Sequence, residues 1–149
     1  MIFDRTISDV ERAIAIRAQK LQNGKSLSDS EIETLERGML TINTINRIEQ
    51  KQKDLYEQII SMFYLNGNVE TKEWDNGEIF YSEDLQRLVK NLEQLRKMYF
   101  VYNNTPENPA ASYKYTALND IEKILYDIDQ YIINMRLNYK YCGGYFCGE

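Results

Sequence analysis

The chain has 149 residues with 18 Lys and Arg, 23 Asp and Glu and no His, which gives a formal net charge of −5. This length suits one domain or two very small ones, and the acidic balance argues against nucleic-acid or anionic-membrane partners, which require a basic surface. The lack of His removes the commonest general base and metal ligand, so Ser–His and Cys–His catalytic pairs and His-containing zinc sites are excluded.

The N-terminal residues lack the basic start and apolar core of a secretory signal peptide. No stretch of the sequence reaches the roughly 18 to 20 apolar residues of a membrane span. We therefore expect a protein that is made in the cytoplasm and has no membrane partner.

Apolar residues at steps of three and four dominate the first half and predict helices. A serine followed three residues later by a glutamate, the spacing of a capping box, occurs at 8–11 and at 28–31 and predicts two helix starts. An Asn-Gly pair ends the first of these helices. A longer third helix is predicted from about 41–44 to an Asn-Gly-Asn stop at 66–68.

The second half repeats this pattern after an irregular connection. Residues 67–81 predict a loop or short hairpin, because 75–78 read Asp-Asn-Gly-Glu and Asn-Gly is a turn signal. A fourth helix is predicted from Ser82, where two acidic residues in the first turn suit the helix dipole. A linker at 103–109 holds both prolines of the chain, and a fifth helix is predicted from about Thr116.

The last residues, 139–149, differ in kind, since aromatic residues flank a Gly-Gly pair and predict a small hairpin or an extended arm. Tyrosine is enriched, with 12 in the chain. Its apolar ring and polar tip suit both the edge of a small core and a protein interface, and both interpretations stay open. The candidate partner-binding residues are Tyr139, Tyr141, Tyr145, Phe146 and Trp74.

Two parts of the chain resemble each other. An Asp-x-x-Arg pattern at 9–12 recurs at 84–87, and an Asn-x-x-Glu pattern at 46–49 recurs at 119–122. Each half then contains an opening helix, an irregular connector and a second helix. The repeat predicts two related helical hairpins that pack together.

The repeated polar residues are interpreted as structural contacts. We expect Arg12 and Arg87 each to reach Glu49 or Glu122 across a hairpin and so to tie two helices together. The asparagine of each Asn-x-x-Glu motif is expected to cap a helix N-terminus.

The remaining candidates for chemistry have simpler explanations. Glu122, Asp127 and Asp129 form an acidic group, but carboxylate-bridged di-metal bundles combine Glu with a His three residues on, so we interpret the group as a solvated face. Cys142 and Cys147 supply two of the four ligands of a structural zinc site, and free thiols are the favoured interpretation. We predict no catalytic residue, no cofactor, no metal site and no enzymatic activity.

A resemblance covers most of the chain outside about 60–73. The stretches that carry it are Arg-Thr-x-x-Asp-Val at 5–10, residues 27–38 and 46–49, residues 82–95 followed by the two prolines, Ala-Leu-Asn-Asp-Ile-Glu-Lys-Ile-Leu at 117–125, and the aromatic, Gly-rich close at 141–149. Together they resemble a helical module encoded in the tail regions of phages and prophages of low-GC Gram-positive bacteria. The resemblance implies a virion protein without catalytic residues, a structural part of the baseplate, tail tip or fibre attachment region. Its expected partners are other tail proteins and further copies of itself.

The alternative hypothesis is a cytoplasmic tail-assembly chaperone or adaptor that is not retained in the particle. For either function the predicted fold is all-α, two related helical hairpins packed as a four- to five-helix bundle. The predicted units are a first hairpin at 1–66, a connecting loop at 67–81, a second hairpin at 82–138 and a C-terminal arm at 139–149.

Overall fold

The structure, a computed structural model, describes residues 1–63, 68–98 and 103–143, although not the side chains of 21, 22, 63 and 139–143. Within these ranges every element is a helix. The helices are α1 (Ile7–Asn23), α2 (Asp29–Gly38), α3 (Ile42–Phe63), α4 (Ser82–Met98) and α5 (Tyr115–Gly143). The predicted all-α class and helical bundle are confirmed.

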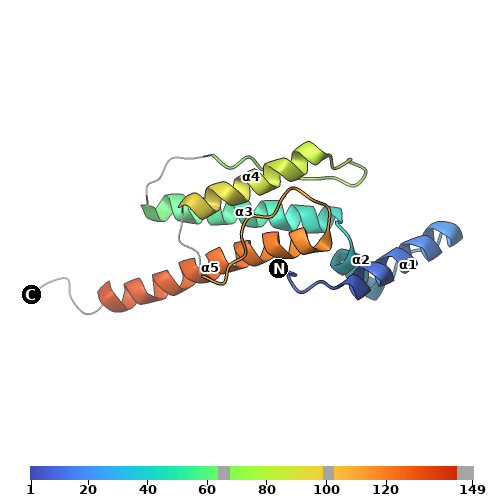
Figure 1. Cartoon of the computed structure of the whole chain (residues 1–149), viewed down its shortest axis with the longest axis horizontal. Helices are drawn as coiled ribbons and strands as arrows, with labels where there is room; N and C mark the ends of the chain where they lie inside the picture. Colours follow the sequence, from blue (N-terminus) through green and yellow to red (C-terminus); the bar gives the residue numbers. More distant parts are fainter. Residues whose placement is uncertain (64–67, 99–102, 144–149) are drawn as a thin grey trace, which may run out of the picture.

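The helices group as a three-helix bundle with a helical hairpin at one end (Figure 1). Helices α3, α4 and α5 pack against one another, and α1 packs chiefly against α2. Helix α1 lies outside the bundle and α4 inside it because the two helices bury different numbers of apolar side chains. Of the described apolar side chains of α1 only that of Ala13 is fully covered, whereas α4 buries four leucines in the bundle.

The core of the bundle comes from one stripe of each of its three helices. The stripes follow the three- and four-residue spacing seen in the sequence, and each fully buried Leu or Ile contributes about 1.5–3 kcal/mol. The core cluster consists of Ile48, Leu55, Ile59, Leu88, Leu92, Leu95, Leu118, Ile121, Ile124, Leu125, Ile128 and Ile132.

The starts of the first two helices are fixed by capping boxes. At α2 the box lies at 28–31, as the sequence predicts. At α1 the predicted pair of Ser8 and Glu11 is wrong, because the N-cap is Thr6 and the third helical residue, Asp9, returns the hydrogen bond to its backbone. A threonine paired with an aspartate satisfies orphan N–H groups in the same way, two residues earlier than the serine would.

The loop before α4 agrees with the sequence prediction, whereas the end of α5 does not. The described part of the predicted loop, 68–81, is irregular, with a turn at 76–77 where Gly77 has φ of +102°, and α4 starts at Ser82 as predicted. Helix α5, however, continues to Gly143 and so occupies the first residues of the predicted arm. Residues 139–142 contain neither Gly nor Pro to stop it. Residues 144–149 lie outside the described part.

The hairpin of α1 and α2 closes tightly at Gly38. A Cβ added there would lie 2.2 Å from the Asp9 carbonyl oxygen and 2.5 Å from the Ala13 Cβ. Beside it, Arg37 pairs with Asp4 at 2.9 Å and with Asp9 at 3.2 Å. Only glycine lets the two helices approach this closely.

Replacing Gly38 with alanine tests this contact. Alanine normally stabilises a helix relative to glycine by about 1 kcal/mol, but here overpacking should lower the free energy of unfolding by about 1–3 kcal/mol. Urea unfolding of Gly38→Ala measures the change, and exposed Glu33→Ala on the same helix is the control. An increase in stability for Gly38→Ala would refute the close contact.

Acid should loosen the hairpin through Asp9. Hydrogen bonds from the Thr6 backbone and hydroxyl, with the Arg37 guanidinium nearby, lower the pKa of Asp9 below its usual 3.8. The ionised carboxylate therefore stabilises the fold fully above pH ~3.8, and this contribution is lost as the pH falls through the folded-state pKa. The protection of α1 amides against hydrogen exchange, taken relative to the intrinsic rate at each pH, should fall over that range. Asp9→Asn should weaken this pH dependence without abolishing it, since Arg37 also lowers the pKa of Asp4, and Glu33→Gln should keep it.

Candidate functional site

Two Asn-x-x-Glu motifs each hold an irregular, non-helical chain segment against a helix. We call Asn46 and Glu49 the α3 clamp and Asn119 and Glu122 the α5 clamp. Each asparagine is the fifth residue of its helix, and the two glutamates are only 2% and 0% exposed. Buried carboxylates of this kind are costly unless they are paired.

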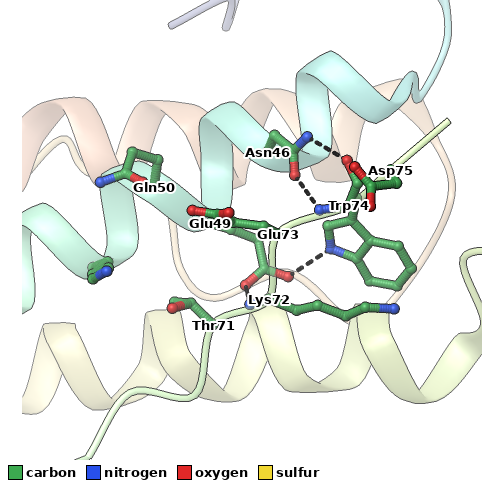
Figure 2. A pocket seen from close by; sticks show the side chains of 9 residues that line it. Asn46, Glu49, Gln50, Thr71, Lys72, Glu73, Trp74 and Asp75 are labelled. Carbon is green, nitrogen blue, oxygen red and sulfur yellow. Dashed lines mark hydrogen bonds between the residues drawn. The ribbon is translucent and has the colours of Figure 1, made fainter. Parts of the chain in front are cut away.

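The α3 clamp grips the backbone around Trp74 (Figure 2). The Asn46 side chain accepts from the Trp74 N–H and donates to the Trp74 carbonyl oxygen, both at 2.9 Å. Glu49 accepts from the Lys72 N–H at 2.9 Å and from the Trp74 indole N–H at 3.1 Å. The segment thereby receives hydrogen bonds that a neighbouring strand would otherwise supply.

Arg87 of α4 completes the α3 clamp. Its two Nη atoms donate to the two carboxylate oxygens of Glu49 at 2.6 and 2.8 Å, and Nη1 also donates to the Glu70 carbonyl oxygen at 2.8 Å. The hydrogen bonds to Glu49 raise the pKa of Arg87 above its usual value. The predicted tie between Arg87 and Glu49 is confirmed, in the bidentate geometry that arginine forms best.

The α5 clamp grips the N-terminal segment in the same manner. Asn119 accepts from the Arg5 N–H at 3.2 Å and donates to the Arg5 carbonyl oxygen at 3.0 Å. Glu122 accepts from the Ile2 N–H, and its Oε1 accepts from Arg5 Nη2 at 2.8 Å. The Arg5 side chain is almost wholly buried in this contact.

A second arginine also reaches Glu122, but it is not the predicted one. Arg47 of α3 donates to Glu122 Oε1 at 2.9 Å. Arg12 is exposed and forms no ion pair within the part of the chain that the structure describes, so its expected tie is wrong. The reason is that α1 leaves the bundle for the hairpin with α2, whereas α4 stays in the bundle.

The two clamps are equivalent and reciprocal. The motifs are 73 residues apart, and each glutamate accepts a backbone N–H, a planar side-chain N–H of the bound segment and an arginine. The α3 clamp holds the segment that leads into α4, and the α5 clamp holds the segment that leads into α1. With residues 1–63 taken as the first half and 68–143 as the second, each half therefore binds the segment that opens the other half.

This arrangement corrects the predicted role of the two asparagines. Neither is an N-cap, because α3 begins at Ile42 and α5 at Tyr115, one turn earlier. Their side-chain amides extend from the side of the helix toward the neighbouring segment. There one amide can accept from the N–H and donate to the carbonyl of a single residue.

Among the candidate partner-binding residues, Trp74 lies inside the protein. It is 4% exposed, with the Lys72 ammonium 3.9 Å from its ring centroid and the Phe80 ring at 5.2 Å. Its indole N–H donates to Glu49, so this group is already bonded within the protein.

The tail candidates stay predictions. The backbone of Tyr139 and Tyr141 belongs to α5, but their side chains are outside the description. Tyr145 and Phe146 lie outside the described residues.

The acidic group on α5 is not a solvated face. Glu122 is the clamp carboxylate, and Asp127 is buried, accepting from the Thr105 hydroxyl at 2.8 Å and pairing with Lys123. Asp129 pairs with Lys51 of α3 at 2.8 Å. Glu122 and Asp127 lie on the sides of α5 that the rest of the chain covers, whereas Asp129 is partly exposed. The described residues contain no group of three His, Cys, Asp or Glu placed to hold a metal ion.

A buried amide pair between α3 and α4 escaped the sequence analysis. Gln52 donates to the Leu88 carbonyl oxygen at 2.8 Å, and Asn91 donates to Gln52 at 3.2 Å and to the Glu70 carbonyl oxygen at 2.8 Å. The available signal was spacing, because Gln52 falls four residues after Ile48 on the buried stripe of α3.

An open hollow of about 470 Å³ borders the α3 clamp, between α3 and the segment 71–75 (Figure 2). The clamp groups on its wall, Asn46 and Glu49, already bond to the segment. The site as built therefore holds the protein's own chain in place.

No family model, curated protein or solved structure matches this chain. Among the described residues, no helix combines the length and the apolar character that crossing a membrane requires.

Neutralising a clamp carboxylate should destabilise the protein. Glu49→Gln removes the bidentate partner of Arg87, which keeps only Asp84 at 3.6 Å, and Glu122→Gln leaves the buried Arg5 without its carboxylate and Arg47 with only Glu36 at 3.9 Å. Breaking one side of a buried pair should cost about 3 kcal/mol in the free energy of unfolding. Urea unfolding measures it, and Glu57→Gln, on the exposed side of α3, should change stability by less than about 0.5 kcal/mol. Equal stability of all three variants would contradict a structural role for the clamps.

Proposed function

We propose that this protein is a non-enzymatic structural component of a phage tail or phage-tail-like particle, placed at the baseplate, tail tip or fibre attachment region. It acts through protein–protein contacts. The observation that carries the proposal is the pair of reciprocal clamps. The stretches that resemble the tail-region module contain Arg5, Asn119 and Glu122, the residues that build the α5 clamp.

The chemistry of the clamps supports a structural function. In each clamp both carboxylate oxygens of the glutamate accept hydrogen bonds from the protein itself. Desolvation offsets much of the attraction in a buried ion pair, so we take the clamps as contacts that fix the arrangement of the chain. A subunit of a particle needs such a fixed shape, because its neighbours bind surfaces at set positions.

The shape of the molecule also supports the proposal. The α1–α2 hairpin projects from one end of the bundle, and α5 extends past the other end (Figure 1). Helices α1 and α5 both carry exposed apolar residues, Ile7 and Ile14 on α1 and Ile133 and Leu137 on α5. Exposed apolar groups on two separate helices suit a subunit that contacts two neighbours.

Quantitative mass spectrometry of purified particles from the producing strain tests the proposal. We expect the protein at a constant molar ratio to a baseplate subunit across preparations, while an abundant host cytoplasmic protein varies as a contaminant. Abundance in the lysate together with absence from the particles would overturn the proposal and favour the assembly chaperone or adaptor.

A variant adds specificity to this test. Glu122→Gln loosens the α5 clamp and should lower incorporation into particles relative to Glu57→Gln, with both expressed at equal levels. The quantity compared is the molar ratio of this protein to the baseplate subunit. A lower yield of particles therefore does not change the result.

A further inference from the structure

Asn76 and Gly77 form the tip of an exposed turn between Trp74 and α4. The Glu78 N–H donates to the Asp75 carbonyl oxygen at 3.2 Å and closes the turn. Both tip residues are exposed, and a Cβ added at Gly77, where φ is +102°, would meet nothing beyond its chain neighbours within 4 Å. The described residues supply no hydrogen-bond partner for the Gly77 N–H or for the Asn76 side chain.

An asparagine followed by glycine carries a reaction of its own. The backbone nitrogen of the glycine loses its proton to solvent and bonds to the asparagine Cγ, and Nδ2 leaves as ammonia. Water then opens the resulting five-membered imide at either carbonyl, without any oxidant or reductant. Opening at Cγ gives aspartate, and opening at the backbone carbonyl gives isoaspartate, whose main chain runs through Cβ and Cγ. Glycine favours ring closure because it has no Cβ to obstruct the approach.

The structure separates this turn from another Asn-Gly pair, which lies at the end of α1. There the Gly24 N–H donates to the Lys20 carbonyl oxygen and Asn23 Nδ2 donates to the Gln19 carbonyl oxygen, both at 2.9 Å. The attacking nitrogen and the leaving group are therefore both held, and their hydrogen bonds have to open before the ring can form. The remaining Asn-Gly pair, at 66–67, lies outside the described residues.

We propose that Asn76 is a site of spontaneous deamidation in the folded protein, with the Gly77 nitrogen as the attacking group and water as the only other reactant. Either product places an added negative charge between Asp75 and Glu78. The ammonia is lost to solvent, so the fraction of modified protein rises with the age of the molecule. This inference goes beyond the proposed function and does not depend on it.

Deamidation should alter the turn and leave the α3 clamp intact. Isoaspartate adds one carbon to the main chain inside the four-residue turn, which disturbs the spacing of its closing hydrogen bond. The clamp bonds reach the segment only as far as Trp74, two residues before Asn76. Aged protein should therefore elute later than fresh protein on anion exchange and keep its helical circular dichroism.

Peptide mapping of the full chain during incubation in mildly alkaline buffer measures the reaction, since mass spectrometry detects the change from amide to acid. Trypsin places the three Asn-Gly pairs in separate peptides, 21–25, 54–72 and 73–87. Asn76 should convert about tenfold faster than Asn23 or more, because the hydrogen bonds at Asn23 must open first. Isoaspartate should appear together with aspartate at position 76, as an imide intermediate requires.

Incubation in guanidinium chloride is the control for the effect of the fold. Once the hydrogen bonds at Asn23 are lost, the two rates should agree to within about threefold. Gly77→Ala should slow conversion of Asn76 about tenfold in both conditions, since the added Cβ obstructs ring closure. The inference would be overturned by an Asn76 that keeps its amide, by equal rates at the two sites in the folded protein, by a difference that persists in guanidinium chloride, or by aspartate without isoaspartate.

Discussion

The structure depends on burying two carboxylates, Glu49 and Glu122, against the chain segments that enter α4 and α1. An isolated buried carboxylate would be strongly unfavourable. Each one is made tolerable by a backbone N–H, a planar side-chain N–H and an arginine. Because the donors are fixed in space, the same bonds that neutralise the charge also set where each segment runs.

The clamps and the apolar core have different roles. The stripes of α3, α4 and α5 supply most of the driving force for the bundle, since burial of Leu and Ile is the dominant favourable term. Apolar packing alone specifies poorly how irregular segments lie across a helix. The clamps supply that information, because an asparagine that bonds both the N–H and the carbonyl of one residue fixes that residue's position and direction.

The sequence predicted the features that depend on local pattern. Helical spacing located the helices, and the repeat of Asn-x-x-Glu marked both clamps, with the tie between Arg87 and Glu49 foreseen. It missed what tertiary placement decides. Arg5 lies in an irregular segment, where helical spacing gives no information. Arg12 does not reach its expected partner because α1 packs on α2. Trp74 was predicted as an interface residue because its sequence neighbours do not reveal its burial. That burial depends on Glu49, a carboxylate 25 residues away in the chain.

The reciprocity of the clamps has a topological consequence. Each half of the chain is, in effect, a ligand of the other: the first half supplies the receptor on α3 and the peptide that α5 receives, and the second half does the converse. Releasing either segment removes the backbone N–H and the side-chain N–H that the segment donates to a buried glutamate of the opposite half, so Glu49 would keep only Arg87 and Glu122 would keep only Arg47. Each half therefore stabilises the other, and coupling of this kind favours unfolding of the bundle as one cooperative unit.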